Sequence, residues 1–141
     1  MRIDIIQTKI KEIEENLKII KEHLPENFDE FSTLGLIKDG IYKRIESSIE
    51  NIIDICAIIN TDLDLAIPES DESILDNLNK ECILSDEMTD ALKNMKGFRN
   101  ILVHRYAYTD DKIAYSVIKE NLDDVYKFID VIEEFIEKRN E

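Results

Sequence analysis

"IYKRIESSIENIIDICAIIN", residues 41–60, decides the fold of this 141-residue chain. Its apolar residues recur every three or four positions, which is the spacing of one face of an α-helix. That face consists of Ile41, Ile45, Ile49, Ile52, Ile53, Cys56 and Ile59. It is widened by Ile55, Ala57 and Ile58. The pattern predicts a helix from about residue 36 or 38 to about residue 60, and the widened face predicts that it is the most buried helix of the protein.

The same periodicity appears on both sides of this stretch. Before it, a stripe that ends just before Pro25 consists of Ile3, Ile6, Ile10, Ile13, Leu17, Ile20 and Leu24. Near the end of the chain, a stripe within residues 111–138 consists of Ile118, Leu122, Val125, Ile129, Ile132 and Ile136. We therefore expect a first helix before Pro25 and a last helix that starts near residue 111 or 115.

Two more helices are predicted between these. One begins near Ser85, a residue type that caps helix N-termini, and points Leu84, Met88, Leu92 and Met95 inward. It continues through Gly97, where a mid-helix glycine costs about 1 kcal/mol relative to alanine and suggests a close backbone approach or a bend. A short helix is expected from residue 73 to 80. With no alternating strand pattern, the sequence predicts an all-α, up-and-down bundle of four main helices plus a short helix, in a single domain of residues 1–141.

The composition limits where the protein works and what it binds. Its formal net charge of −14 argues against broad, non-specific nucleic-acid binding. Screening over about 8–10 Å nevertheless leaves room for a local cationic site. No apolar run approaches the roughly 20 residues that span a bilayer, and the charged start "MRIDIIQTKIKEIEE" lacks the core of a signal peptide. We expect a cytoplasmic protein without membrane contact, in which Cys56 and Cys82 are reduced, buried thiols.

One short stretch departs from this acidity: "KGFRNILVHRY", residues 96–106. No acidic residue lies between Asp90 and Asp110, whereas that interval contains four cations, Lys93, Lys96, Arg99 and Arg105. On a helix at 100° per residue, the polar groups of this stretch span one broad arc, and Phe98, Ile101 and Leu102 are left to be buried.

The residue types in this arc suit RNA chemistry. Arg99 offers a planar cationic fork for phosphate, and His104 can accept or donate a proton near neutral pH. Asn100 lies four positions before His104 and can hold the imidazole. Together they suffice for metal-independent RNA cleavage, and a two-fold dimer would supply the second histidine that two proton transfers need. The alternative is an ordinary solvated or hydrogen-bonded pair, as we expect for His23 near the end of the first helix.

The quoted residues also resemble a known family. "FRNILVHRY" resembles the R-x4-H-x-Y signature of HepT-like toxins in the HEPN superfamily, and "LKNMKGFRNILVHRY" resembles the longer block around it. The segment "LIKDGIYKRIESSIENIIDICAII" is similar to the second helix of that family, and "LDDVYKFIDVIEEFI" is similar to its last helix. The resemblance therefore covers most of the chain.

The resemblance implies a ribonuclease toxin that acts as a homodimer, with a composite site at the dimer cleft. Arg99 and His104 would carry the catalysis, supported by Asn100, with no metal and no cofactor. A minimal nucleotidyltransferase antitoxin would neutralise the toxin by transferring AMP to Tyr106. Further phosphate contacts are expected from Lys96 and Arg105.

Several alternatives remain open from the sequence. The acidity fits a narrow RNA substrate, such as a tRNA region or an mRNA, but also a non-catalytic module that binds a nucleotidyltransferase, or a purely structural dimer. Glu50 and Asp54, four residues apart on the second helix, form either a metal or acid–base pair or, as we favour, a solvated or ion-paired helix face, with Arg99 or Arg44 as an internal partner.

Overall fold

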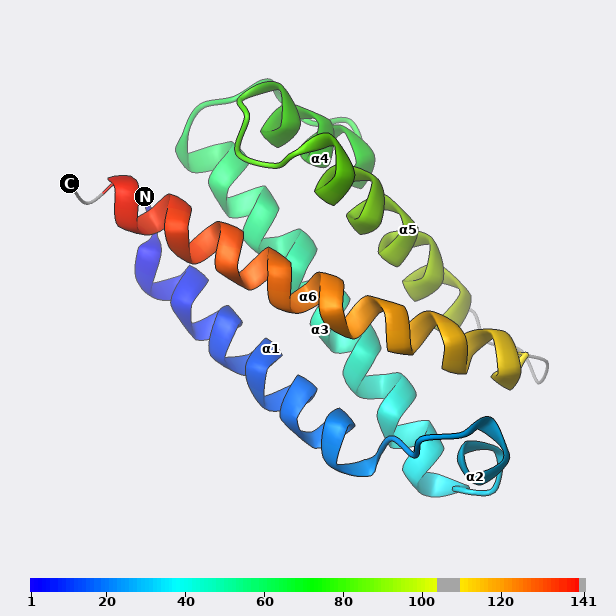
Figure 1. Ribbon diagram of the computed structural model, residues 1–141. Coiled ribbons are helices and arrows are strands. Elements are labelled where there is room, and N and C mark those ends of the chain that lie inside the picture. Colours follow the sequence, from blue (N-terminus) through cyan, green and yellow to red (C-terminus); the bar gives the residue numbers. More distant parts are fainter. Residues whose placement is uncertain (104–109, 140–141) are drawn as a thin grey trace.

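The computed structural model describes residues 1–103 and 110–139, and its regular structure over these residues is helical (Figure 1). This confirms the all-α prediction. The described helices are α1 (Ile3–His23), α2 (Phe28–Ser32), α3 (Leu36–Asp62), α4 (Asp71–Lys80), α5 (Asp86–Val103) and α6 (Asp111–Arg139).

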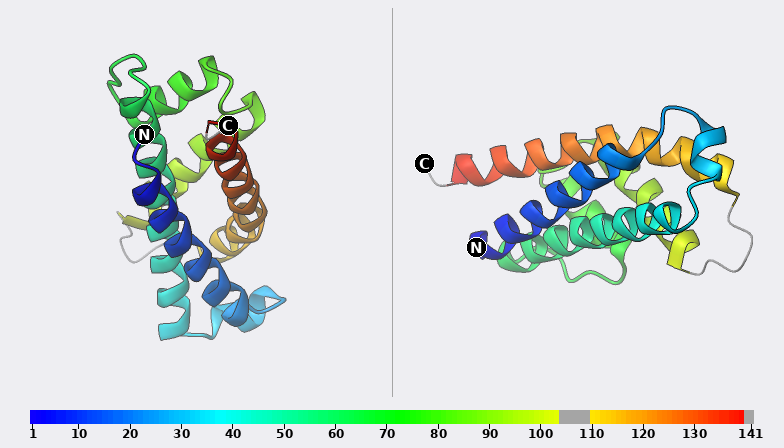
Figure 2. Two further views of the ribbon diagram at one scale, coloured as in Figure 1. Left: turned by 90° about the vertical axis from the view of Figure 1, so that its left-hand side faces the viewer. Right: turned by 90° about the horizontal axis from the view of Figure 1, so that it is seen from below.

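The long helices lie side by side and give the molecule two distinct ends. α1 and α3 run antiparallel, α6 lies along them, and α5 packs on α3 and on the short α4 (Figures 1 and 2). Both chain termini are at one end. The end of α5, the start of α6, the start of α3 and α2 gather at the other. We call this second end the motif end, because the described part of the arginine motif lies on α5 near it.

Residues suited to helix N-termini fix where three of the predicted helices begin. Gly35 precedes α3 with a φ of +58°, in the left-handed region that favours glycine. The hydroxyl of Ser85 accepts the backbone N–H of Met88 at 3.0 Å, as its predicted capping role requires. Asp110 accepts the backbone N–H of Lys112 at 3.0 Å, which places the start of α6 at the earlier of the two predicted positions.

The five-residue helix α2 was not predicted, because it is too short to show a hydrophobic period. It begins after Asn27, whose side chain accepts a backbone N–H at 2.9 Å. Phe31 of α2 is fully buried, with ring-centroid distances of 5.9 Å to Tyr42 and 5.0 Å to Tyr115. This missed helix therefore closes the core at the motif end, and the bundle has two short helices rather than one.

The predicted stripes form the core. α3 has twelve buried residues, α6 has ten and α1 has six, so α3 is more buried than the other two long helices, as its widened face predicts. Within the described ranges, no helix is long and apolar enough to cross a membrane.

The two cysteines differ in their surroundings. Cys56 is fully buried, as expected, and burial raises the pKa of its thiol. The expectation of a buried thiol is wrong for Cys82, which is exposed. It lies in the turn between α4 and α5 with a φ of +59°, where the chain reverses direction outside the core.

Candidate active site at the end of α5

The last turns of α5 carry the described half of the motif. Phe98 and Leu102, four residues apart, point into the core, and this orientation fixes the rotation of the helix. It leaves Arg99 and Asn100 half-buried at the flank of α5. His104, Arg105 and Tyr106 lie outside the described residues, so their roles stay predictions.

The same rotation corrects one expectation. Ile101 was expected to bury with its neighbours, but 58% of its surface is exposed. Because Phe98 and Leu102 already occupy the inner face of the helix, Ile101 points away from the core. The motif end of α5 therefore presents an apolar side chain to the outside.

Arg99 extends from α5 toward α3. Its Nε lies 3.8 Å from Oε1 of Glu50, and the side chain keeps 24% of its surface exposed. The Nε atom is buried, and no described residue forms a hydrogen bond with it. A separation of 3.8 Å is longer than a hydrogen bond, so Glu50 acts on Arg99 through charge alone in this state.

The other described cations of the stretch are hydrogen-bonded. Lys93 Nζ lies 2.7 Å from Asp76 Oδ1, and Lys96 Nζ lies 2.6 Å from Glu72 Oε1. The bond to Asp76 raises the pKa of Lys93, and the bond from Lys96 lowers the pKa of Glu72. The stretch thus lacks acidic residues only along the sequence. In space, α4 supplies a carboxylate to Lys93 and another to Lys96, and α3 supplies Glu50 to Arg99.

Glu50 and Asp54 of α3 each lie opposite a cation, as we favoured. Glu50 faces Arg99, one of its two expected partners, and Asp54 Oδ2 lies 3.4 Å from Lys9 Nζ of α1. Over the described ranges, no group of three or more acidic, histidine or cysteine side chains is arranged to hold a metal ion.

Two other residues singled out in the sequence have simple environments. His23 Nδ1 lies 2.9 Å from a backbone carbonyl oxygen of α1, which fits its place at the end of that helix. Gly97 is exposed, and a Cβ placed on it would meet no described atom within 4 Å. The close backbone approach that we expected at Gly97, as one of two explanations, is therefore not found among the described residues.

The residues that follow the motif are fixed to α3. The Asp111 carboxylate accepts a hydrogen bond of 2.5 Å from the Tyr42 hydroxyl and one of 2.7 Å from Lys38 Nζ. Asp111 is the first residue of α6, and Tyr42 and Lys38 lie in the first turns of α3. These bonds hold the chain in place directly after residues 104–109, just as the core contacts of Leu102 hold it directly before them.

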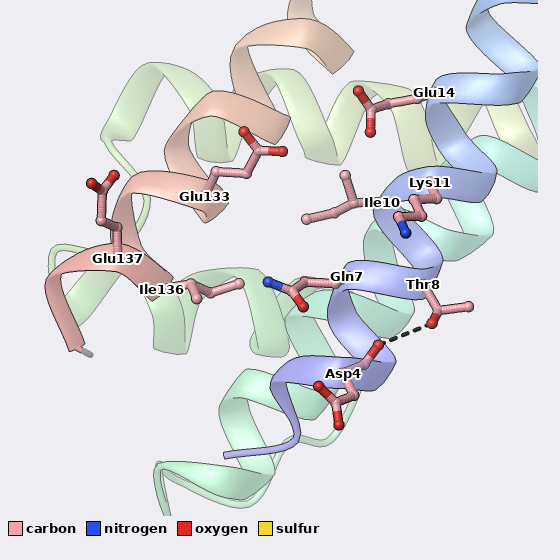
Figure 3. Close-up of a pocket in the computed structure, with 9 residues that line it drawn as sticks. All are labelled: Asp4, Gln7, Thr8, Ile10, Lys11, Glu14, Glu133, Ile136 and Glu137. Carbon is pink, nitrogen blue, oxygen red and sulfur yellow. Dashed lines mark hydrogen bonds between the residues drawn. The ribbon is translucent and has the colours of Figure 1, made fainter.

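A groove at the opposite end of the bundle is unsuited to RNA. It lies between α1 and α6 near the chain termini and has a volume of about 730 Å³ (Figure 3). Its charged lining includes Lys11 and the carboxylates Asp4, Glu14, Glu133 and Glu137. Burial raises the pKa of Glu133, and the nearby charges of Glu14 and Asp130 add to the effect. So many carboxylates would repel phosphate, so this groove is a poor candidate for an RNA site.

Comparison with known proteins identifies the family of the chain. A family model described as "Ribonuclease HepT-like" matches residues 13–132. The mRNA nuclease HepT of Shewanella oneidensis is 32% identical over 129 residues, which cover 92% of this chain and 96% of that protein. A solved structure of the tri-AMPylated HEPN toxin of Shewanella oneidensis in complex with its MNT antitoxin superposes with a TM-score of 0.84, at 31% identity, over 93% of this chain and 98% of that one.

A more distant structure shares the fold alone. It is YutE of Bacillus subtilis, a cytosolic protein of unknown function, which is 19% identical and has a TM-score of 0.84 over 99% of this chain and 93% of its own. The fold and the arginine–asparagine pair on α5 define a helical domain of the HEPN class. Within that class, the chain belongs to the HepT-like ribonuclease family, as its motif predicted.

Proposed function

We propose that the protein is the ribonuclease toxin of a toxin–antitoxin pair, and that it cuts RNA in the cytoplasm with Arg99 and His104. The observation that carries this proposal is the state of Arg99. It is half-buried at the end of α5, and no described residue satisfies its Nε, whereas Lys93 and Lys96 on the same helix are hydrogen-bonded. A buried donor without a partner in a folded protein calls for an explanation, and a catalytic role of its side chain is one such explanation.

In the proposed reaction, Arg99 binds the scissile phosphate and stabilises the negative charge that grows on it. The ribose 2′-oxygen attacks phosphorus, and the bond from phosphorus to the 5′-oxygen breaks. His104 takes the proton from the 2′-hydroxyl or gives one to the leaving 5′-oxygen. Asn100 holds the imidazole from one helical turn away. The step needs no metal ion and no cofactor.

A homodimer would complete this site, since one histidine performs one proton transfer at a time. Four of the exposed apolar side chains support such a dimer. They occur at the start of α3, the end of α5 and the start of α6, which lie at the motif end (Figure 1). They are Leu36, Ile37, Ile101 and Ile113. Exposed apolar residues that gather in this way are typical of a protein interface.

We further propose control by a nucleotidyltransferase antitoxin. The related Shewanella oneidensis toxin is AMPylated in its complex with the MNT antitoxin. In this chain the acceptor would be Tyr106, whose phenolic oxygen attacks the α-phosphorus of ATP and releases pyrophosphate. The new phosphodiester adds a negative charge close to Arg99 in sequence, where it would compete with RNA for the guanidinium.

A non-catalytic module that only binds the nucleotidyltransferase is the second candidate. The acidity of the chain favours it, because carboxylates accompany each described cation of the motif stretch. It predicts a stable complex with the partner and no RNA cleavage by either protein.

Cleavage of cellular RNA by the purified protein distinguishes the two candidates. We expect Arg99→Ala and His104→Ala each to lower the cleavage rate by about 10²-fold or more, since each removes a group that acts in the transition state. Arg2→Ala is the matched control, because Arg2 pairs with Asp62 at the end of the bundle that holds the chain termini. Cleavage that persists in both motif variants, or wild-type protein that cleaves no RNA, would contradict the proposed function.

A further inference from the structure

We propose that Glu50 of α3 is a positioning residue for Arg99: its carboxylate holds the Nε side of the guanidinium, so that the two Nη groups face the RNA phosphate. The inference rests on the proposed ribonuclease function and deepens it. It adds a residue from α3 to a site whose motif residues all come from one later stretch of the sequence.

The first observation is a regular row of charge pairs. Lys93, Lys96 and Arg99 follow one another at intervals of three residues along α5. The two lysines are joined to carboxylates of α4 at 2.7 and 2.6 Å. The third pair, between Arg99 and Glu50, is open at 3.8 Å. The row therefore contains two closed pairs and one that is incomplete.

The second observation is the atom of Arg99 that faces Glu50. An arginine donates from Nε and one Nη along one edge, and from both Nη groups at its tip. The contact reaches Nε, and this Nε is buried without a hydrogen bond from any described residue. A carboxylate at that edge leaves the tip available for phosphate, so Glu50 and RNA can bind the same guanidinium together.

The third observation is the freedom of Glu50 itself. Its side chain is 47% exposed, so a change of rotamer can bring Oε1 from 3.8 Å to hydrogen-bonding distance. Closing the pair would satisfy the buried Nε and fix the plane of the guanidinium. Such fixation favours catalysis, because small errors in the placement of a transition-state contact slow the reaction strongly.

The kinetic test uses Glu50→Gln, which removes the negative charge of the side chain and keeps its shape. We expect Glu50→Gln to lower kcat for RNA cleavage about 10-fold and to change KM less than about 3-fold, with Glu50→Asp intermediate. Asp54→Asn is the matched control on the same helix, because Asp54 pairs with Lys9 of α1 rather than with the motif. Its kinetics should match the wild type. A rise in kcat/KM for Glu50→Gln would overturn the proposal, since it would show that Glu50 competes with phosphate.

A second measurement does not depend on RNA cleavage. Proton exchange at the Arg99 Nε–H, followed by ¹⁵N NMR and assigned by its loss in Arg99→Lys, should be several-fold faster in Glu50→Gln than in the wild type. Equal exchange in the two proteins would overturn the role of Glu50 even if the ribonuclease is active. Slower exchange in the wild type together with no RNA cleavage would instead refute the proposed function and leave the pairing in place.

Discussion

Lys96 on α5 and Glu72 on α4 form a closed ion pair, with Nζ 2.6 Å from Oε1. Lys96 belongs to the cationic stretch that we predicted to contact phosphate, yet its charge is already compensated within the chain. RNA must therefore displace Glu72 before it gains this contact, and the exchange of one anion for another yields little binding free energy. The acidic residues that give the chain its net charge of −14 thus weaken phosphate binding at the site itself, in addition to repelling RNA at long range.

The first prediction follows from this pair. Replacing Glu72 by Gln should free Lys96 and tighten the binding of a non-cleavable 2′-O-methyl RNA about 2- to 5-fold. It should also steepen the salt dependence of log K by up to about one counterion, because one more lysine is available to phosphate. Binding titrations at two salt concentrations check both effects. Unchanged affinity would show that Lys96 lies off the RNA path.

The second prediction concerns the groove between α1 and α6 (Figure 3). The pKa of Glu133 is raised, so its ionisation at neutral pH costs folding free energy. Glu133→Gln should therefore raise the free energy of unfolding at pH 7. The gain should shrink as the pH falls through the raised folded-state pKa toward the ordinary value, because the wild-type carboxyl then becomes neutral as well.

Urea unfolding of both proteins across pH 4–7.5 measures this difference. Glu137→Gln, in the same groove, serves as the comparison at each pH. A constant difference between Glu133→Gln and wild type over the whole range would contradict the electrostatic explanation, since only an ionisation gives that pH dependence.

The long helices could be predicted from the sequence, because their apolar residues recur with the period of a helix. α1, α3 and α6 were visible because Ile and Leu recur along each of them, and Ser85 marked the start of α5 by its capping chemistry. Five-residue α2 has no period to read. The carboxylates opposite the motif were mostly missed, because their pairing depends on how α4 packs on α5. Glu50 was the exception, because Arg99 was already one of the two ion-pair partners expected for it from the sequence.

The third prediction concerns Gly97. An alanine at this exposed helical position would meet no described atom within 4 Å. Gly97→Ala should therefore stabilise the fold by about 0.5–1 kcal/mol, which is the difference in helix propensity. Thermal unfolding checks it. A lower melting temperature would mean that something beyond the described residues, such as a second copy of the chain, lies close to this turn of α5.

The last prediction tests the dimer through Ile101. This side chain is 58% exposed and lies one helical turn after Gly97 on α5. Ile101→Glu would place a charge in the proposed apolar interface without disturbing the core, so we expect dissociation of the dimer into monomers that keep the helical circular dichroism of the wild type. Sedimentation over a range of protein concentrations measures the association.

Ile67→Glu is the control for this test, because Ile67 is 92% exposed and lies in the loop before α4, away from the motif end. It should sediment like the wild type. If the cleft is composite, Ile101→Glu should also lose RNA cleavage in proportion to the fraction of monomer, and raising its concentration should restore activity. A monomer that cleaves RNA at the wild-type rate would show that one copy of Arg99 and His104 is sufficient, and that the second proton transfer is made by solvent or by another group of the same chain.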